Sequence, residues 1–396
     1  MDRRRPPPRP LPPHRRTRRP PRQLPGPAVT ARQGPRTAPP PPRQVAIVAF
    51  AQTDHRPDTT EASETELLMP VLHQVLAQVR LTAADIDFTC SGSCDYLAGR
   101  AFSFTLALDG VGAWPPISES HVEMDGAWAL HEAWVKLLTG RADTALVYAY
   151  GKSSAGDLRA VLTRSLDPYH LAPLWPDPVA LAALQTQALI DQGATDEPAL
   201  ARIAARNRTA ATANPHAQLA GSPPPERLLA EEYLLRPLRR HDCPPIGDGA
   251  AAVVLAAGDT ARRLCARPAW IRGIDHRVEP HGLGVRDLTD SPSTRLAARH
   301  AGFFEAPVDT AELHAPFTAQ EVVLRRALDL PEDGAVTVNP SGGALAANPV
   351  MATGLIRLGE AATRIHQGRS RRALAHATSG PCLQHNLVAV LEAEPT

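Results

Sequence analysis

The stretch MDGAWALHEAWVKLLTGRADTAL (residues 124–146) has a counterpart later in the chain, ATGLIRLGEAATRIHQGRSRRAL (352–374). When the two are aligned, Gly126 matches Gly354, and in both copies a Gly-Arg pair comes shortly before an Ala-Leu pair. Each copy predicts a helix that ends near a glycine and is followed by a buried strand. Helices so rich in Ala and Gly are buried on most sides. The repeat therefore predicts two copies of one α/β unit, with these helices packed between layers.

Short apolar runs elsewhere are typical of buried strands. They are QVAIVAFAQT (44–53), IDFTCSGS (86–93), TALVYAYG (144–151) and DGAAAVVLAAGD (248–259). The stretch SETELLMPVLHQVLAQV (63–79) has helical spacing that Pro70 interrupts. Because strands and helices of this length alternate, we expect an α/β protein whose sheet is covered on both faces.

The chain changes character between about 152 and 235, where the Pro-broken loop DPYHLAPLWPDP (167–178) precedes two helical stretches. This region indicates a helical loop domain inserted between two strands. We therefore expect three parts: a basic tail over 1–44, an N-terminal half over 45–258 that contains the loop domain, and a C-terminal half over 259–396.

The composition limits the classes of function. With 396 residues, 43% of them hydrophobic, the chain can form a large core, and it has no apolar run of the ~18 residues that a membrane span needs. Its five cysteines are scattered and odd in number, which fits the reducing cytoplasm better than a disulfide framework. Cys90 and Cys94 lack a second pair of ligands at metal spacing, so we expect no metal site. The missing P-loop and dinucleotide glycine fingerprint argue against ATP and NAD chemistry.

Charge is divided unevenly along the chain. Residues 1–43 contain twelve Arg and one Asp and carry +11, which leaves −10 for the rest because the formal net charge is +1. So rich in Pro and Arg, the tail is expected to be disordered. It could bind anionic partners, target the chain, or be translated from a start upstream of the native one near Val45. Only two lysines accompany forty arginines, a bias of GC-rich genomes, and we favour the upstream start.

Five segments resemble, in order, segments of sterol-carrier-type thiolases, a family that includes bacterial proteins labelled lipid-transfer proteins. They are GATDEPALARIAARNRTAATANPHAQ (193–218), PLRRHDCPPIGDGAAAVVLA (237–256), ELHAPFTAQEVV (312–323), NPSGGALAANP (339–349) and SGPCLQHNLVAVLE (379–392). The resemblance covers roughly 45–394. It implies a duplicated five-layer α/β/α/β/α fold with a loop domain, a homodimer, and coenzyme A thioesters as substrates with no tightly bound cofactor.

In this family a cysteine at the N-terminus of the first buried helix takes up the acyl group, activated by the helix dipole and a nearby His. It lies in a Cys-x-Ser-Gly turn, and the matching residues here are Glu123, Met124, Asp125 and Gly126. The helix and the glycine are kept, and Gly126 is expected to lie against the substrate, but the thiol is missing. Ser120 with Glu123 fits a capping box, and Asp125 fits an N-cap. The two acids therefore either cap the helix or act on the substrate.

The family's Gly-His-Pro triplet is altered as well, because the matching triplet here is Ala-Asn-Pro with Asn348 at its centre. Asn348 can donate a hydrogen bond to an oxyanion but cannot shuttle a proton. Asn339 and the pair Gly342-Gly343 are kept, and they suit a tight turn beside a ligand. We expect these three residues to bind substrate.

His314 takes the place of the histidine in a His-Asp-x-Phe-like motif, here His-Ala-Pro-Phe, and can act as a base or an oxyanion donor. The aspartate of that motif is missing. Cys382 lies in the loop TSGPCLQ (378–384), near the place of the family's second cysteine. Its neighbours Ser379 and Gly380 are expected to contact substrate.

Three functions remain open. The first is carbon–carbon bond cleavage or formation without a covalent intermediate, as in relatives that are retro-aldolases on steroid side chains. Glu123, Asp125, His314 and Asn348 would supply the base and the oxyanion donors. Such relatives work with a small, separate OB-fold protein that carries a zinc ribbon. The second is acyl transfer with the nucleophile relocated to Cys382. The third is a catalytically silent subunit that binds acyl-CoA or lipid. No nucleic-acid partner is expected.

Overall fold

The structure is a computed structural model that describes residues 43–59, 61–331 and 334–395. Of the basic tail predicted over 1–44, residues 1–42 lie outside the described residues. None of the helices in these ranges is long and apolar enough to cross a membrane.

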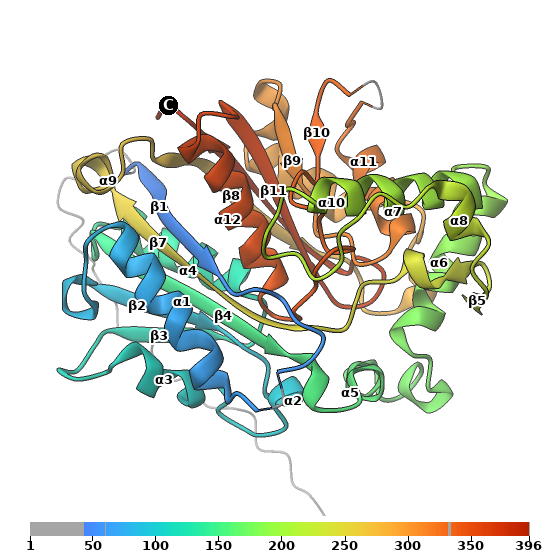
Figure 1. Ribbon diagram of the computed structural model, residues 1–396, viewed down its shortest axis with the longest axis horizontal. Coiled ribbons are helices and arrows are strands. Elements are labelled where there is room, and N and C mark those ends of the chain that lie inside the picture. The colour runs from blue at the N-terminus through green and yellow to red at the C-terminus, as the bar shows by residue number, and fades with distance from the viewer. Residues whose placement is uncertain (1–42, 60, 332–333, 396) are drawn as a thin grey trace, which may run out of the picture. The chain divides into compact units, whose positions relative to one another are not determined.

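A mixed sheet of ten strands runs through the described part of the chain (Figure 1). Its strands are β1 (Val45–Gln52), β2 (Phe88–Gly92), β3 (Glu119–Val122), β4 (Thr144–Lys152), β7 (Asp248–Ala257), β8 (Ala269–Val278), β9 (Thr310–Glu312), β10 (Thr337–Val338), β11 (Arg372–Ser379) and β12 (His385–Glu392). They lie in the order β10-β9-β11-β12-β8-β1-β7-β4-β2-β3.

Each half of this sheet has the same topology. From the middle outward, β1–β7–β4 and β8–β12–β11 pair antiparallel, and β4–β2–β3 and β11–β9–β10 pair parallel. The halves join at β1 and β8, where Ala46 lies opposite Trp270 and Ile47 opposite Ala269. The repeat in the sequence is therefore a repeat of structure.

Seven helices pack on the faces of this sheet. They are α1 (Glu64–Gln78), α3 (Thr105–Val111), α4 (Gly126–Leu138), α9 (Gly258–Leu264), α10 (Pro292–His300), α11 (Thr318–Ala327) and α12 (Thr353–His366). The repeated helices α4 and α12 contact each other, and their side chains share one core with both sheet halves. α1, α3 and α9 cover the outer face of the first half, and α10 and α11 that of the second. This confirms the predicted duplicated five-layer α/β/α/β/α architecture.

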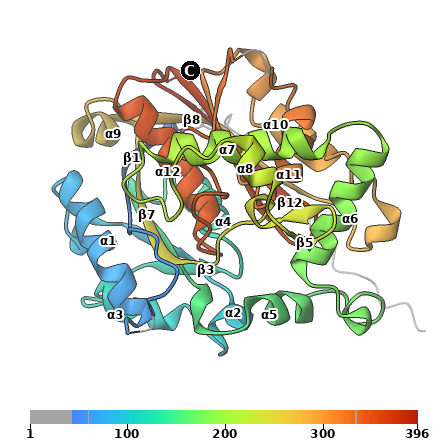
Figure 2. The same ribbon diagram turned by 45° about the vertical axis from the view of Figure 1, so that its right-hand side comes forward.

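The region between β4 and β7 is helical, as predicted for about 152–235. Its elements are α5 (Leu158–Arg164), α6 (Pro178–Asp191), α7 (Glu197–Ala211), α8 (Pro225–Leu229), β5 (Tyr233–Leu235) and β6 (Leu238–Arg239). α6 and α7 begin where Asp177 and Asp196 cap them and a proline takes one of the first helical positions. Figure 1 shows α6, α7 and α8 on its right-hand side, and Figure 2 shows the same helices turned forward. α6 and α7 contact α11. The domain boundaries stay a prediction.

Pro70 does not interrupt its helix, contrary to the sequence-based expectation. α1 continues through it from Glu64 to Gln78. A proline inside a helix leaves the carbonyl four residues earlier without its N–H partner. Pro70 and Glu66, the residue that carries this carbonyl, are both exposed on α1, so water can take the missing hydrogen bond.

The carboxylate of Asp125 caps both central helices at once. Its Oδ1 accepts a hydrogen bond from Ala127 N at 2.8 Å at the start of α4. The same carboxylate accepts from Gly354 N at 2.9 Å and Leu355 N at 3.1 Å at the start of α12. The side chain is buried, and burial raises its pKa to about 6, although the three N–H groups favour the anion. One side chain therefore ties the two halves of the fold together.

The repeated glycines have a packing reason at this junction. A Cβ atom on Gly354 would lie 2.4 Å from Asp125 Oδ1, and one on Gly126 would lie 2.6 Å from Ala149 Cβ. Both distances are below any real contact, so a side chain at 354 would push α12 away from Asp125, and one at 126 would push α4 away from β4 and from Leu355 of α12.

Asp125→Ala is expected to lower the free energy of unfolding by about 2–4 kcal/mol, because three buried N–H groups lose their acceptor. Asp125→Asn keeps one carbonyl oxygen and is expected to lose less than half as much. Urea unfolding followed by circular dichroism measures both. Equal losses for the two variants would contradict the double cap.

Candidate active site

A cavity of about 1120 Å³ opens where α4 and α12 begin. All five predicted catalytic residues line it, together with two of the predicted substrate contacts. They are Glu123, Asp125, His314, Asn348, Cys382, Ser379 and Gly380. The loop region supplies an apolar wall that includes Leu158, Leu162, Val179 and Leu181. Both halves and the loop region therefore contribute to one site.

The two acids at the mouth of α4 have different surroundings. Asp125 is occupied by the capping contacts described above. Glu123 comes directly after β3, is exposed, and accepts a hydrogen bond from Asp95 N through Oε1 at 2.5 Å. Asp95 begins the short helix α2 (Asp95–Ala98), which follows β2. Of the two acids, Glu123 is the one with a carboxylate open to the cavity.

His314 lies in the wall of the cavity as a neutral ring. Its Nδ1 accepts a hydrogen bond from Thr378 N at 3.3 Å, which places the ring proton on Nε2. Burial, aided by the nearby His376 and Arg357, lowers the pKa of His314 to about 3. At neutral pH this side chain can donate one N–H but carries no charge.

Asn348 lies beside His314, within side-chain hydrogen-bonding distance of its ring. Its Oδ1 accepts from Thr353 Oγ1 at 3.1 Å, which orients the amide. The N–H of the ring and those of the amide therefore lie next to each other in the cavity wall. Two such donors are what an oxyanion formed from a thioester needs.

Cys382 is a packed thiol. Its Sγ donates to Leu181 O at 3.5 Å, and its own carbonyl accepts from Arg286. Only 7% of the residue is exposed, and burial raises the pKa of the thiol to about 11. At neutral pH Cys382 therefore carries its proton, whereas a nucleophilic cysteine needs the thiolate.

The other predicted substrate contacts do not line this cavity. Asn339 Oδ1 accepts from Leu313 N at 2.7 Å and so holds the chain just before His314. A Cβ on Gly342 would lie 2.6 Å from Ala211 Cβ, and one on Gly343 would meet the Asn339 side chain. Asn339, Gly342, Gly343 and Gly126 are therefore packing residues that allow neighbouring segments to approach closely, and they lie outside the cavity lining.

Among the cavity residues that the sequence did not single out are Cys94, Arg208 and Arg240. In the sequence, Cys94 was considered only as a metal ligand. It follows β2 as Glu123 follows β3, and these two strands are parallel neighbours. Because the carboxyl ends of parallel strands meet at one edge, its nearness to Glu123 could have been inferred. Burial is the main cause that raises the pKa of Cys94, and Glu123 adds to it. The two arginines had no such signal, because only the folded loop region brings them together.

Cys382 is expected to resist alkylation by iodoacetamide at pH 7.5, because a rise of its pKa from 9.0 to about 11 means about a hundredfold less thiolate. Peptide mapping of the folded chain measures this. The same chain in guanidinium chloride is the control, and there all five cysteines should be modified. Rapid labelling of Cys382 in the folded chain would contradict the packed thiol.

No family model matches the chain. Curated relatives nevertheless match most of it. An acetyl-CoA acetyltransferase of Methanothermobacter thermautotrophicus is 26% identical over 375 residues, which cover 87% of this chain and 96% of the relative. A 17-hydroxy-3-oxo-4-pregnene-20-carboxyl-CoA lyase of Mycobacterium tuberculosis is 27% identical over 340 residues, which cover 77% of this chain and 85% of the lyase.

Solved structures share the fold. The "Ltp2-ChsH2(DUF35) aldolase" aligns with a TM-score of 0.72 and 19% identity over 88% of this chain and 98% of its own. Human mitochondrial 3-ketoacyl-CoA thiolase aligns with a TM-score of 0.69 and 15% identity over 89% and 99%. The duplicated five-layer body with a cavity at its central helices is thus the thiolase fold. The chain is therefore similar in sequence to a thiolase over most of its length, and it shares the thiolase fold.

Proposed function

We propose that this protein cleaves a carbon–carbon bond in a β-hydroxyacyl-CoA thioester by a retro-aldol reaction without a covalent intermediate. The observation that carries this proposal is that Glu123 lines the cavity and is exposed, at the position that the resemblance matches to the family's nucleophilic cysteine. The thiol of Cys382 is packed and protonated. The relationship to an acyl-CoA lyase and the likeness to an aldolase support the same class of reaction.

The residues of the cavity can supply each step of this reaction. Glu123 takes the proton of the β-hydroxyl, and the O–H electrons form a carbonyl as the bond between the α- and β-carbons breaks. The electrons of that bond become the thioester enolate, whose oxygen accepts hydrogen bonds from His314 and Asn348. The proton held by Glu123 then passes to the α-carbon. The products are a ketone or aldehyde and a shortened acyl-CoA, so atoms and electrons balance without a co-reactant.

We propose that Arg208 and Arg240 bind the phosphates of coenzyme A. Both line the cavity, and within the described ranges neither guanidinium forms an ion pair or donates a hydrogen bond. Burial lowers the pKa of Arg208; the carboxylates of Glu231 and Asp242 oppose this shift, and the positive charge of Arg240 adds to it. Two neighbouring cations that no carboxylate holds in an ion pair favour a bound anion. The acidic body of the protein can therefore still bind a polyanionic substrate.

The proposed assembly is a homodimer that works with a separate OB-fold protein carrying a zinc ribbon. The solved neighbour whose name joins Ltp2 to a DUF35 protein supports a partner of that kind. A location in the cytoplasm and a role in steroid side-chain breakdown likewise belong to the proposal.

Glu123→Gln is expected to lower kcat for 17-hydroxy-3-oxo-4-pregnene-20-carboxyl-CoA by about 10²–10⁴-fold, because the amide cannot accept the hydroxyl proton. Liquid chromatography with mass spectrometry follows the ketone and the shortened acyl-CoA, with the zinc-ribbon partner added where the chain alone is inactive. Glu132→Gln, an exposed change on α4, is the control and should retain activity.

Two other outcomes would replace this proposal. An acyl mass added to the intact chain and mapped to Cys382 would favour acyl transfer by a relocated nucleophile. Binding of acyl-CoA with no turnover, unaffected by Glu123→Gln, would favour a silent binding subunit.

Arg208→Ala and Arg240→Ala are each expected to raise KM for the CoA thioester about tenfold with little change in kcat, since they would remove contacts made equally in ground and transition state. The loss should shrink at high salt and for the thioester of dephospho-CoA. Arg227→Ala, an exposed change on α8, is the control. An unchanged KM in both cavity variants would place the phosphates elsewhere.

A further inference from the structure

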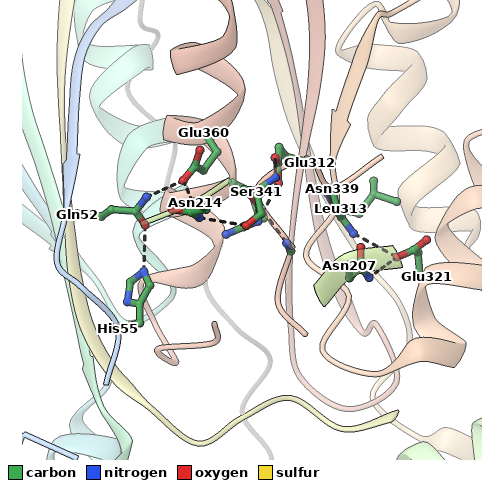
Figure 3. A network of polar contacts seen from close by, with 12 residues as sticks. Gln52, His55, Asn207, Asn214, Glu312, Leu313, Glu321, Asn339, Ser341 and Glu360 are labelled. Atoms are coloured by element: carbon green, nitrogen blue, oxygen red, sulfur yellow. Dashed lines mark hydrogen bonds and ion pairs between the residues drawn. The ribbon is translucent and has the colours of Figure 1, made fainter. Parts of the chain in front are cut away.

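Behind His314 lies a buried polar cluster that does not touch the cavity. Glu312 is the last residue of β9, two positions before His314. Its Oε1 accepts from Ser341 N at 3.0 Å, and its Oε2 accepts from Ser341 Oγ at 2.7 Å. Figure 3 shows Glu312 and Ser341 side by side, with Asn339 next to Leu313. The chain leading to His314 is therefore held from the side away from the substrate.

Arg357 on α12 completes this cluster. It is only 2% exposed, and its Nη1 donates to Glu312 Oε2 at 2.7 Å and to Ser341 Oγ at 2.5 Å. Its positive charge acts on two residues of the cavity wall. It helps to lower the pKa of His314, and it partly offsets the rise that burial causes in the pKa of Asp125. One buried cation is thus shared by the end of β9 and by two groups of the site.

Further contacts fix the ring of His314. Leu313 N donates to Asn339 Oδ1 at 2.7 Å, and Asn339 Nδ2 donates to Glu321 Oε2 at 3.2 Å. The backbone N of His314 donates to His376 O at 3.2 Å. The backbone around His314 is therefore tied to the segment 339–341 and to β11, and the Thr378 N–H holds the ring itself through Nδ1.

A buried ion pair contributes little to stability compared with an apolar pair of similar volume. The pair Glu312–Arg357 does have an electrostatic effect that an apolar pair would lack. A guanidinium behind the ring disfavours the imidazolium form of His314 and leaves a neutral ring with a single N–H to donate. A neutral donor with a fixed orientation is suited to stabilising an oxyanion.

We infer that Glu312 and Arg357 are positioning residues for His314: they hold the end of β9 and the ring so that a neutral N–H faces the cavity. The use of that N–H on a thioester oxygen rests on the proposed function. The placement itself rests only on the contacts of the folded chain.

The test is the double variant Glu312→Leu with Arg357→Met, which removes both charges at similar volume, because either single change would leave a buried charge unpaired. The matched control is Glu392→Leu with Arg372→Met, which removes a pair joined by a 2.8 Å contact at the opposite end of β11. Circular dichroism checks the fold of each. Chains labelled with ¹⁵N-histidine report the tautomer and titration of His314, assigned with His314→Gln.

In the parent chain, His314 should show one tautomer, protonated on Nε2, and stay neutral down to pH 5. In the double variant we expect mixed tautomers and a titration midpoint shifted upward, and for acyl-CoA a kcat about tenfold lower or more with KM within about twofold. Arg357→Lys keeps a positive charge beside Glu312, and both contacts of Arg357 come from one nitrogen, so His314 should stay neutral in this variant, as in the parent chain.

Histidine signals and kcat in the double variant equal to those of the control pair would overturn the inference, since a purely structural pair would leave both unchanged. If no acyl-CoA is turned over, the histidine signals decide alone, so the proposed function can fail while this inference stands. If the double variant does not fold, Glu312→Gln and Arg357→Lys are measured in the same way.

Discussion

The carboxylate of Asp125 is the contact on which the rest of the structure depends. Two helices from opposite halves of the chain begin at this single side chain, and it accepts hydrogen bonds from the first N–H groups of both. Such N–H groups have no partner within their own helix, so a buried junction needs an acceptor of this kind. The glycines at 126 and 354 follow from the same constraint, because any side chain would separate the helices.

The cavity lies at this junction, and so the groups that hold the fold also border the site. Asp125 is committed to the backbone, which leaves Glu123 as the acid that is open to the cavity. Arg357 balances Glu312 in the interior and acts at the same time on His314 and Asp125. A site built this way has its donors fixed by the core itself, which lowers the reorganisation needed when charge develops.

Particular residues show how far the sequence could be interpreted. The strands around Val45–Gln52 and Thr144–Lys152 were predicted because apolar runs of that length have few alternatives. The prediction that Pro70 interrupts its helix was wrong, because a proline on the solvent-exposed side of a helix removes only one hydrogen bond, which water can replace. Asn339 and the Gly342-Gly343 pair were predicted to form a tight turn beside the substrate. The turn instead packs against Ala211 of α7 and Leu313 after β9, two segments that are distant in the chain.

The sequence by itself determined the duplication, the layered α/β architecture and the candidates at the mouth of the first repeated helix, because these depend on local periodicity and on motifs that lie within short segments. Only the tertiary structure decided which acid is used for capping, that Cys382 is packed, and that Arg208 and Arg240 face the same cavity. These properties depend on burial and on contacts between distant segments, since the charge state of a thiol or a carboxylate is set by what surrounds it in the folded chain.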